Sequence, residues 1–177
     1  PWKIAISYLY DIFKEDYAAY VPKHLQEKKH QIITEIIKKD INSPKASSIG
    51  RLFDAVAALL GFDAKITFQG EAAIDLENLC CRDDQSFYQY NISLEDGIYI
   101  IDCKPLIKSV VIEVIDGIDK ELIARRFHNT IIKFTIELCE ILRKEYHLSS
   151  VVLSGGVFQN EILLINVYKE LIKRDFK

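Results

Sequence analysis

The sequence is poor in the residue patterns that build metal sites. It has no methionine and only four cysteines, of which Cys80 and Cys81 are adjacent while Cys103 and Cys139 stand alone. Structural zinc sites use closely spaced cysteine pairs, and many catalytic ones use an HExxH helix; neither pattern occurs here. We therefore expect reduced thiols and no complete metal site within these residues.

The sequence also lacks a signal peptide, and no apolar run approaches the roughly 20 residues that cross a bilayer. The cytoplasm is the expected location. The net charge is −3 and the pI about 5.8, whereas a broad nucleic-acid surface needs a basic face, so nucleic acid is not an expected partner. The first residue is Pro1 and not methionine, and Lys177 directly follows a helical pattern. We therefore expect a part of a longer protein, truncated at both ends.

Helical periodicity dominates what is present. Two apolar runs flank Glu95, Asp96 and Gly97, and Asp-Gly between such runs predicts a β-hairpin. Residues 151–154 predict a short strand before two glycines and a last helix. The whole predicts an α/β lobe, helix-rich with a small sheet and a hairpin. The other predicted helices cover residues 2–13, 25–41, 47–61, 71–80 and 105–115, and a long one runs from about Leu122 to Leu142.

The segment VVLSGGVFQN, residues 151–160, is the first candidate site. Gly155 and Gly156 let the backbone approach a ligand, and the helix expected after them presents unpaired amides and a positive dipole end. Asn160, expected in the first turns of that helix, can both donate to and accept from a ribose or an adenine edge. The alternative is a tight turn that needs glycine only for its backbone angles.

Three further candidates lie in other predicted helices. Arg51 and Asp54 share one face of a mostly apolar helix, so they either form an exposed ion pair or face a cleft, where Asp54 could accept from ribose hydroxyls. Gly70 precedes a helix with a small, acidic first turn, and the simpler interpretation is a helix-start glycine. His128 is more often a hydrogen-bonded histidine within a helix than a ligand. Its neighbour Asn129 leaves a role in a polar cleft open.

Together these segments resemble HypF-type carbamoyltransferases. PWKIAISYLYD is similar to the family's PWR-x-A-x-x-YLYD stretch, and SSIGRLFDAVAALLG to its SSMGRLFDAVAALLG. QGEAAIDLE, IARRFHNT and VVLSGGVFQN resemble YEGQAAIELE, FHNTL and LSGGVFQNRLL. These five motifs occur in the family's order from the first residue to the last helix.

The resemblance implies a fragment, residues 1–177, of the threonylcarbamoyl-transferase-like domain, in the actin/hexokinase-like ATPase superfamily. Its nucleotide-binding residues would be Asp54, Gly70 and Asn160, with Gly155 and Gly156 giving backbone approach. The implied reaction joins carbamoyl phosphate and ATP into carbamoyl-adenylate and carbamoylates the C-terminal cysteine of the partner HypE during nickel–iron hydrogenase maturation.

The family's zinc-finger pairs, acylphosphatase-like region and adenylate-forming domain are absent from this sequence, and its metal ligands would lie outside residues 1–177. Divalent metal and zinc are therefore expected only in the full-length protein, and the fragment alone is expected to be inactive. Two alternatives stay open: a tRNA threonylcarbamoyl transferase, and a non-catalytic interaction module with the same fold. The absence of a basic face and the motif SGGVFQN both argue against the tRNA threonylcarbamoyl transferase.

Overall fold

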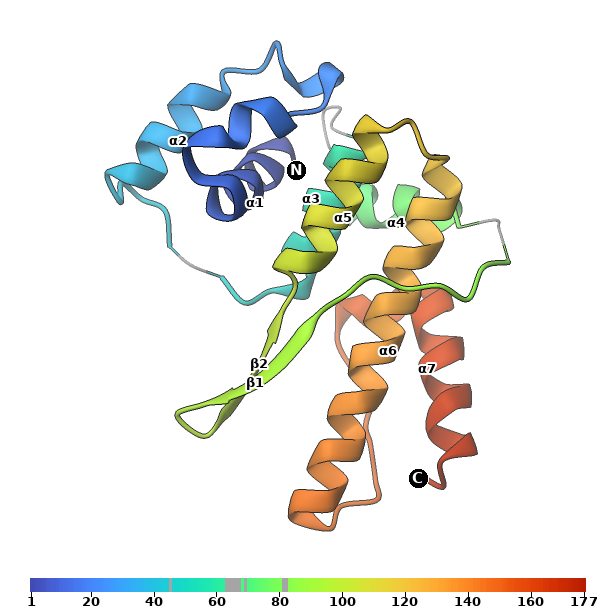
Figure 1. The fold of residues 1–177 in the computed structure, drawn as a ribbon. Helices are drawn as coiled ribbons and strands as arrows, with labels where there is room; N and C mark the ends of the chain where they lie inside the picture. Colours follow the sequence, from blue (N-terminus) through green and yellow to red (C-terminus); the bar gives the residue numbers. More distant parts are fainter. Residues whose placement is uncertain (45, 63–67, 69, 81–82) are drawn as a thin grey trace.

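The computed structural model describes residues 1–44, 46–62, 68, 70–80 and 83–177 (Figure 1). Among them, helices predominate, and a two-stranded antiparallel sheet is the only sheet. The α-helices are α1 (Trp2–Phe13), α2 (His30–Lys38), α3 (Ile49–Leu59), α4 (Glu71–Asn78), α5 (Lys104–Ile115), α6 (Lys120–Tyr146) and α7 (Glu161–Lys173); the strands are β1 (Asn91–Glu95) and β2 (Ile98–Asp102). The prediction of a helix-rich lobe with a hairpin is confirmed.

Helix α3 is the centre of the core, with α1, α4 and α5 packed around it (Figure 1). Nearly every residue from Leu52 to Leu60 is buried, and Asp54 is the one polar exception. A helix that is apolar on all sides has to be surrounded by other elements. It ends as predicted at Gly61, where φ is +99° and the Phe62 and Gly61 amides donate back to Ala57 and Ala58.

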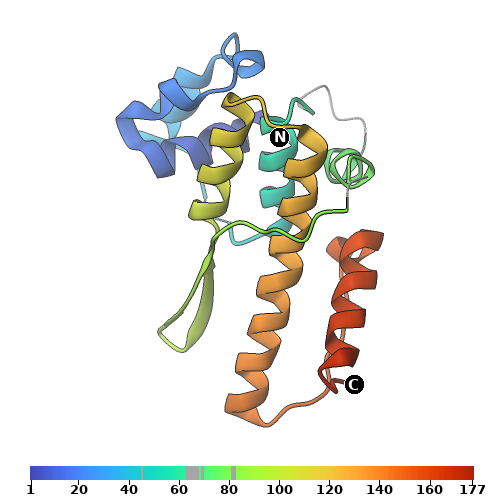
Figure 2. The same ribbon diagram turned by 45° about the vertical axis from the view of Figure 1, so that its right-hand side comes forward.

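The long helix α6 carries the second half of the fold (Figure 2). Its first half packs on α5, and α7 lies beside its other half. Residues 147–154 return along α6, so that the start of α7 lies near α4. The hairpin projects from the start of α5 and turns at Asp96 and Gly97, both at positive φ, as its Asp-Gly signal predicts.

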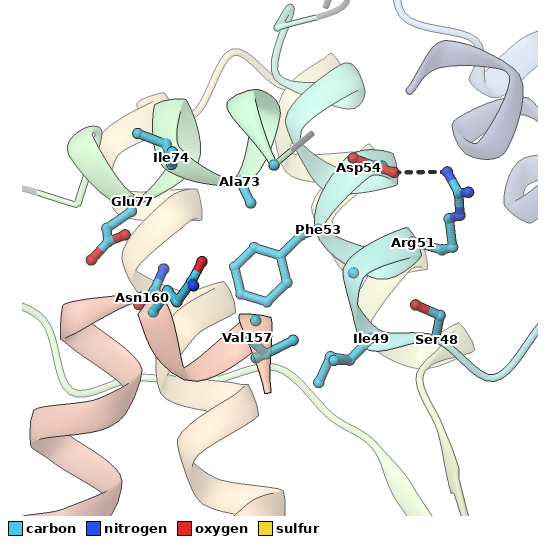
Figure 3. Close-up of a pocket in the computed structure, with 14 residues that line it drawn as sticks. Ser48, Ile49, Arg51, Phe53, Asp54, Ala73, Ile74, Glu77, Val157 and Asn160 are labelled. Atoms are coloured by element: carbon cyan, nitrogen blue, oxygen red, sulfur yellow. Dashed lines mark hydrogen bonds and ion pairs between the residues drawn. The ribbon is translucent and has the colours of Figure 1, made fainter. Parts of the chain in front are cut away.

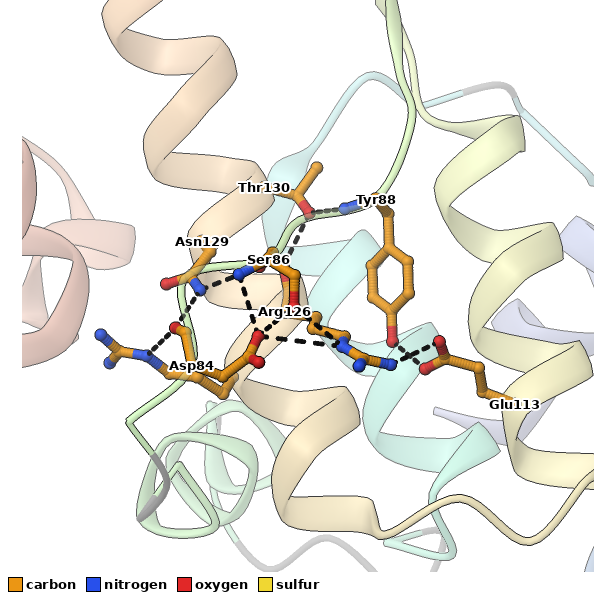
Figure 4. Close-up of polar contacts among 8 residues, drawn as sticks. Asp84, Ser86, Tyr88, Glu113, Arg126, Asn129 and Thr130 are labelled. Atoms are coloured by element: carbon orange, nitrogen blue, oxygen red, sulfur yellow. Dashed lines mark hydrogen bonds and ion pairs between the residues drawn. The ribbon is translucent and has the colours of Figure 1, made fainter.

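Residues 83–90 are fixed across α6 by a polar network rather than by strand pairing (Figure 4). The backbone amide of Tyr88 donates to Thr130 Oγ1 at 2.8 Å, and its hydroxyl donates to Glu113 at 2.6 Å. Arg126 donates to the other oxygen of Glu113 at 2.7 Å. Burial first, and then the Glu113 carboxylate, raise the pKa of Tyr88, so that its hydroxyl stays a donor. The network joins this segment to both α5 and α6.

One predicted helix is shorter than expected, and one predicted strand is wrong. The helix expected over residues 25–41 is only α2, since Lys23–Leu25 forms a separate 3-10 turn before it. The buried face of α2 carries His30 and Thr34, both within hydrogen-bonding distance of the Tyr17 hydroxyl, while Ile32 is exposed. Residues 151–154 form no strand among the described residues: Val151 donates to the Lys177 carbonyl, but Val152 is 86% exposed. Most of the segment KITFQ, residues 65–69, lies outside the described residues.

Candidate functional site

A pocket of about 760 Å³ lies where α3, α4 and residues 156–160 meet (Figure 3). This volume is within the range of roughly 300–1,000 Å³ typical of small-molecule sites. The pocket is lined by Ser48, Ile49, Gly50, Arg51, Phe53, Asp54, Gly70, Ala73, Ile74, Glu77, Gly156, Val157, Gln159 and Asn160. Three segments distant in the sequence therefore contribute to one hollow.

Arg51 and Asp54 lie on the side of the pocket formed by α3 (Figure 3). Both interpretations of this pair hold at once: the Arg51 guanidinium donates to an Asp54 oxygen at 3.3 Å, and both residues line the pocket. The Asp54 side chain is 23% exposed and that of Arg51 60%. The structure thus gives one wall of the pocket a partly accessible carboxylate beside an exposed cation.

Gly70 lies at the start of α4, facing α3 across the pocket. Its φ of +90° and ψ of −4° are left-handed, so the backbone turn itself favours glycine. A Cβ at this position would meet no atom within 4 Å, so the space beside it is open. The helix-start role and the pocket position are therefore compatible.

Gly155 and Gly156 have different roles. Gly155 has φ +88° and ψ 170°, a region that is essentially restricted to glycine, and it is not among the lining residues. Gly156 lines the pocket, has no such backbone demand, and has open space where a Cβ would be. The turn needs the first glycine, while the second leaves room beside the pocket.

Asn160 lies in the pocket wall but not inside a helix, which corrects the predicted placement. A short 3-10 turn, Gly156–Gln159, follows the glycines, and Asn160 is the N-cap of α7. Its Oδ1 accepts from the Leu163 amide at 2.9 Å. The residue is 8% exposed, so its amide is held in place at the pocket wall.

The amino end of α7 is not open to a ligand, contrary to the expectation from the sequence. Glu77 Oε1 accepts from the Glu161 amide at 2.6 Å and lies 3.4 Å from the Ile162 nitrogen. Sequence reasoning missed Glu77, although it lies seven residues after Gly70 and so on the same face of α4. It also missed Phe53, whose ring lies between α3 and Asn160 in Figure 3.

His128 lies behind the pocket wall and does not line it. The residue is fully buried in α6, and its Nε2 is 3.1 Å from Asn160 Nδ2. Its Nδ1 is 2.8 Å from the carbonyl oxygen of Ala124. Burial lowers the pKa of His128 to about 4, so the ring is neutral at physiological pH. The predicted cleft role is therefore indirect, through Asn160.

The described residues contain no group of three or more His, Cys, Asp or Glu side chains that could hold a metal ion. Burial raises the pKa of Cys103 to about 11 and also raises that of Cys139, so neither thiol is an activated nucleophile. In the part of the chain that the structure describes, no helix is both long and apolar enough for a bilayer. The chemistry available here is binding by a carboxylate, an amide, a guanidinium and exposed backbone.

Comparisons with known proteins match nearly the whole chain to one family. The family model described as the second subdomain of the carbamoyltransferase Kae1-like domain matches residues 1–177. Carbamoyltransferase HypF of Synechocystis sp. is 29% identical over 99% of this chain and 24% of its own length. A probable carbamoyltransferase HypF of Methanocaldococcus jannaschii is 26% identical over 99% of this chain and 23% of its own.

The fold matches a solved structure of the same family. A crystal structure of full-length HypF, described as the phosphate- and nucleotide-bound form, superposes with a TM-score of 0.89 and 36% identity, covering 98% of this chain and 23% of that one. The chain thus spans about a quarter of the length of the relatives it matches. By its sequence match over all residues and by its fold, the chain belongs to the HypF carbamoyltransferase family, as the second subdomain of the Kae1-like domain.

Proposed function

We propose that this chain forms the nucleotide-binding side of the carbamoyl-transfer cleft in a larger HypF-type enzyme. The supporting observation is that Arg51, Asp54, Gly70, Gly156 and Asn160, predicted from three separate motifs, line one pocket. A pocket with a few convergent polar groups is the usual form of a small-molecule site. The proposal assigns an adenine nucleotide to it.

Each wall supplies a group that suits one part of such a nucleotide. The Asp54 carboxylate can accept hydrogen bonds from ribose hydroxyls, and these bonds are stronger because the acceptor is charged. The Arg51 guanidinium can swing away from its 3.3 Å contact with Asp54 and neutralise phosphate charge. Asn160 offers an amide to the nucleoside, and Gly70 and Gly156 leave room for close backbone approach.

In the proposed reaction, carbamoyl phosphate and ATP give carbamoyl-adenylate with release of phosphate and pyrophosphate, and the carbamoyl carbon then passes to the C-terminal cysteine of a HypE-type acceptor. The new carbon–sulfur bond replaces the carbon–oxygen bond to the adenylate, AMP leaves, and the thiol proton is released. The role of this chain is to hold the adenylate so that the carbamoyl group faces the acceptor. An acceptor thiol remains reduced in the cytoplasm, where we place the reaction.

The described residues do not by themselves form a metal site. We propose that any divalent metal or zinc of the full-length enzyme is held outside residues 1–177. The elevated pKa values of Cys103 and Cys139 also agree with an acceptor thiol supplied by another protein. We accordingly propose that the chain alone does not catalyse transfer.

A titration of the full-length protein that carries this chain tests the nucleotide assignment. Calorimetry with ADP and with AMP should give binding that is weakened about tenfold or more by Asp54→Ala and by Asn160→Ala, since each removes one good polar contact. Asn166→Ala, on the outer turns of α7, and Asp11→Ala, on α1, are the matched controls and should bind as wild type. Unchanged affinity in both pocket variants would remove the assignment.

A second assay tests the acceptor. Full-length protein is incubated with labelled carbamoyl phosphate, ATP and either a HypE-type protein or tRNA. Label is expected on the C-terminal cysteine, and a HypE variant without that cysteine should stay unlabelled. Label on tRNA together with threonine, and none on the protein acceptor, would contradict the proposal.

A further inference from the structure

The amide of Asn160 has neighbours that distinguish its two ends. Its Oδ1 is 2.9 Å from the Leu163 nitrogen, a backbone donor in the first turn of α7. Its Nδ2 is 3.1 Å from Nε2 of His128, which belongs to α6. Each end of the amide therefore contacts a group that is fixed in a different helix.

The tautomer of His128 follows from its other nitrogen. The carbonyl oxygen of Ala124 is 2.8 Å from Nδ1, and a carbonyl can only accept, so Nδ1 carries the hydrogen of the neutral ring. The Cys80 sulfur, 3.1 Å from the same nitrogen, shares that hydrogen. Nε2 is then a bare lone pair and can only accept, which requires a donor on Asn160. The amide nitrogen is that donor.

Rotation of the Asn160 amide by half a turn would break both contacts. Its oxygen would face the lone pair of His128, and its NH2 group would face the N–H of Leu163. Leaving two buried polar groups without partners costs roughly 1–3 kcal/mol for each. The imidazole cannot rotate to compensate, because its ring packs edge-on against Phe53 at 5.5 Å and Phe127 at 5.6 Å between ring centroids.

We propose that His128 is a positioning residue that fixes the Asn160 amide and thereby sets the hydrogen-bond pattern this wall of the pocket offers to the nucleotide. With one hydrogen given to His128 and one lone pair used by Leu163, Asn160 has one N–H and one lone pair left. Such an amide matches a ligand edge with an adjacent acceptor and donor, as on adenine. This inference rests on the proposed nucleotide site.

A double-mutant cycle on the full-length protein, measured as ADP affinity, tests it. His128→Leu keeps the volume and removes the acceptor, so it should weaken ADP about tenfold, which corresponds to one hydrogen bond of about 1.4 kcal/mol. In the Asn160→Ala background the same change should have no further effect, because the group it positions is gone. His128→Gln, whose carbonyl can accept from Asn160, should restore most of the affinity. With Asp54→Ala, the His128→Leu effect should remain a full tenfold.

The outcomes separate the two proposals. If wild type fails to bind ADP, or if neither Asp54→Ala nor Asn160→Ala weakens its binding, the nucleotide assignment fails and this inference fails with it. If Asp54→Ala weakens ADP but Asn160→Ala binds as wild type, the nucleotide site stands and this inference is wrong. If Asn160→Ala weakens ADP and His128→Leu weakens it further in that background, the nucleotide site stands but the positioning role is wrong. If His128→Leu fails to fold, His128→Gln decides. A tenfold loss of ADP affinity in His128→Gln at unchanged melting temperature would overturn the inference. Nitrogen NMR of the wild-type protein that placed the hydrogen on Nε2 of His128 would also overturn the inference.

Discussion

The Glu77 carboxylate lies 2.6 Å from the backbone nitrogen of Glu161 and so occupies the amino end of α7. A negative charge at this end of a helix is stabilised by the unpaired amides and the helix dipole. Because Glu77 belongs to α4, the contact also ties α4 to α7 at the wall of the pocket. We predict that Glu77→Ala lowers the free energy of unfolding by about 1 kcal/mol, the size of a lost helix cap. Urea denaturation measures it.

Asp75→Ala is the matched control, since it removes the same charge from the same helix. The Asp75 side chain has no hydrogen bond or ion pair within the described part of the chain, so the change should stay within about 0.5 kcal/mol. Glu77→Gln should keep part of the stability, because its amide oxygen still accepts. Equal stabilities of Glu77→Ala and Asp75→Ala would show that the α4–α7 contact contributes nothing.

Gly155 and Gly156 predict opposite phenotypes. Gly155→Ala forces a side chain onto φ +88° and ψ 170°, which should destabilise the protein by roughly 1–3 kcal/mol. Gly156→Ala meets no atom and needs no unusual angle, so its melting temperature should match wild type. Its methyl group lies at the pocket, however, and should weaken ADP binding. Thermal denaturation and calorimetry on both variants check this; a stable Gly155→Ala protein would contradict the assignment of roles.

Short-range signals in the sequence predicted the elements well. The apolar run from Leu52 to Leu60 predicted a buried helix, and Asp96 and Gly97 predicted the hairpin turn, because both depend on neighbouring residues alone. The pocket residues Asp54, Gly70 and Asn160 were found from motifs, and the structure places all three at one hollow.

Contacts between distant residues could not be predicted in the same way. Glu77 and Glu161 are 84 positions apart, and His128 and Asn160 are 32 apart, so no local pattern joins them. The strand expected at residues 151–154 failed for a related reason. An apolar run becomes a strand only when another strand pairs with it. Among the described residues, the Val151 amide donates to the Lys177 carbonyl, and no strand pairs with this run.

His128 predicts how stability depends on pH. Burial, first, and the charge of Arg125 lower its pKa from 6.5 to about 4, and the Ala124 carbonyl opposes this. Between about pH 4 and 6.5 the unfolded chain binds a proton that the folded chain excludes, so stability rises with pH across this window and is complete above it. The shift corresponds to about 3 kcal/mol.

His128→Gln removes this titration. The free energy of unfolding, measured by urea from pH 4.5 to 7.5, should fall less steeply toward acid in the variant than in wild type. Subtracting the two curves cancels the contribution of the other three histidines and of the carboxylates. Parallel curves would mean that the folded protein protonates His128 as readily as the unfolded chain does.

Glu113 carries the last prediction, because it accepts from two partners at once: the Tyr88 hydroxyl at 2.6 Å and the Arg126 guanidinium at 2.7 Å (Figure 4). Both carboxylate oxygens are used, and the Glu113 and Arg126 side chains are only 23% and 24% exposed. Glu113→Ala leaves the half-buried Arg126 guanidinium and the buried Tyr88 hydroxyl without this carboxylate. The free energy of unfolding should therefore fall by about 2–3 kcal/mol. Tyr88→Phe removes only one hydrogen bond and should cost about 1 kcal/mol.

In the Glu113→Ala background, Tyr88→Phe should cost nothing or even stabilise, since the hydroxyl has already lost its acceptor. Lys39→Ala provides the control ion pair: Lys39 lies 3.9 Å from Glu35 with both side chains more than half exposed, and its loss should stay within about 0.5 kcal/mol. Urea denaturation of the two single variants, the double variant and Lys39→Ala, each compared with wild type, measures these differences. If Glu113→Ala is no more harmful than Lys39→Ala, the contacts of Glu113 with Tyr88 and Arg126 do not contribute to the stability of the segment from residue 83 to residue 90.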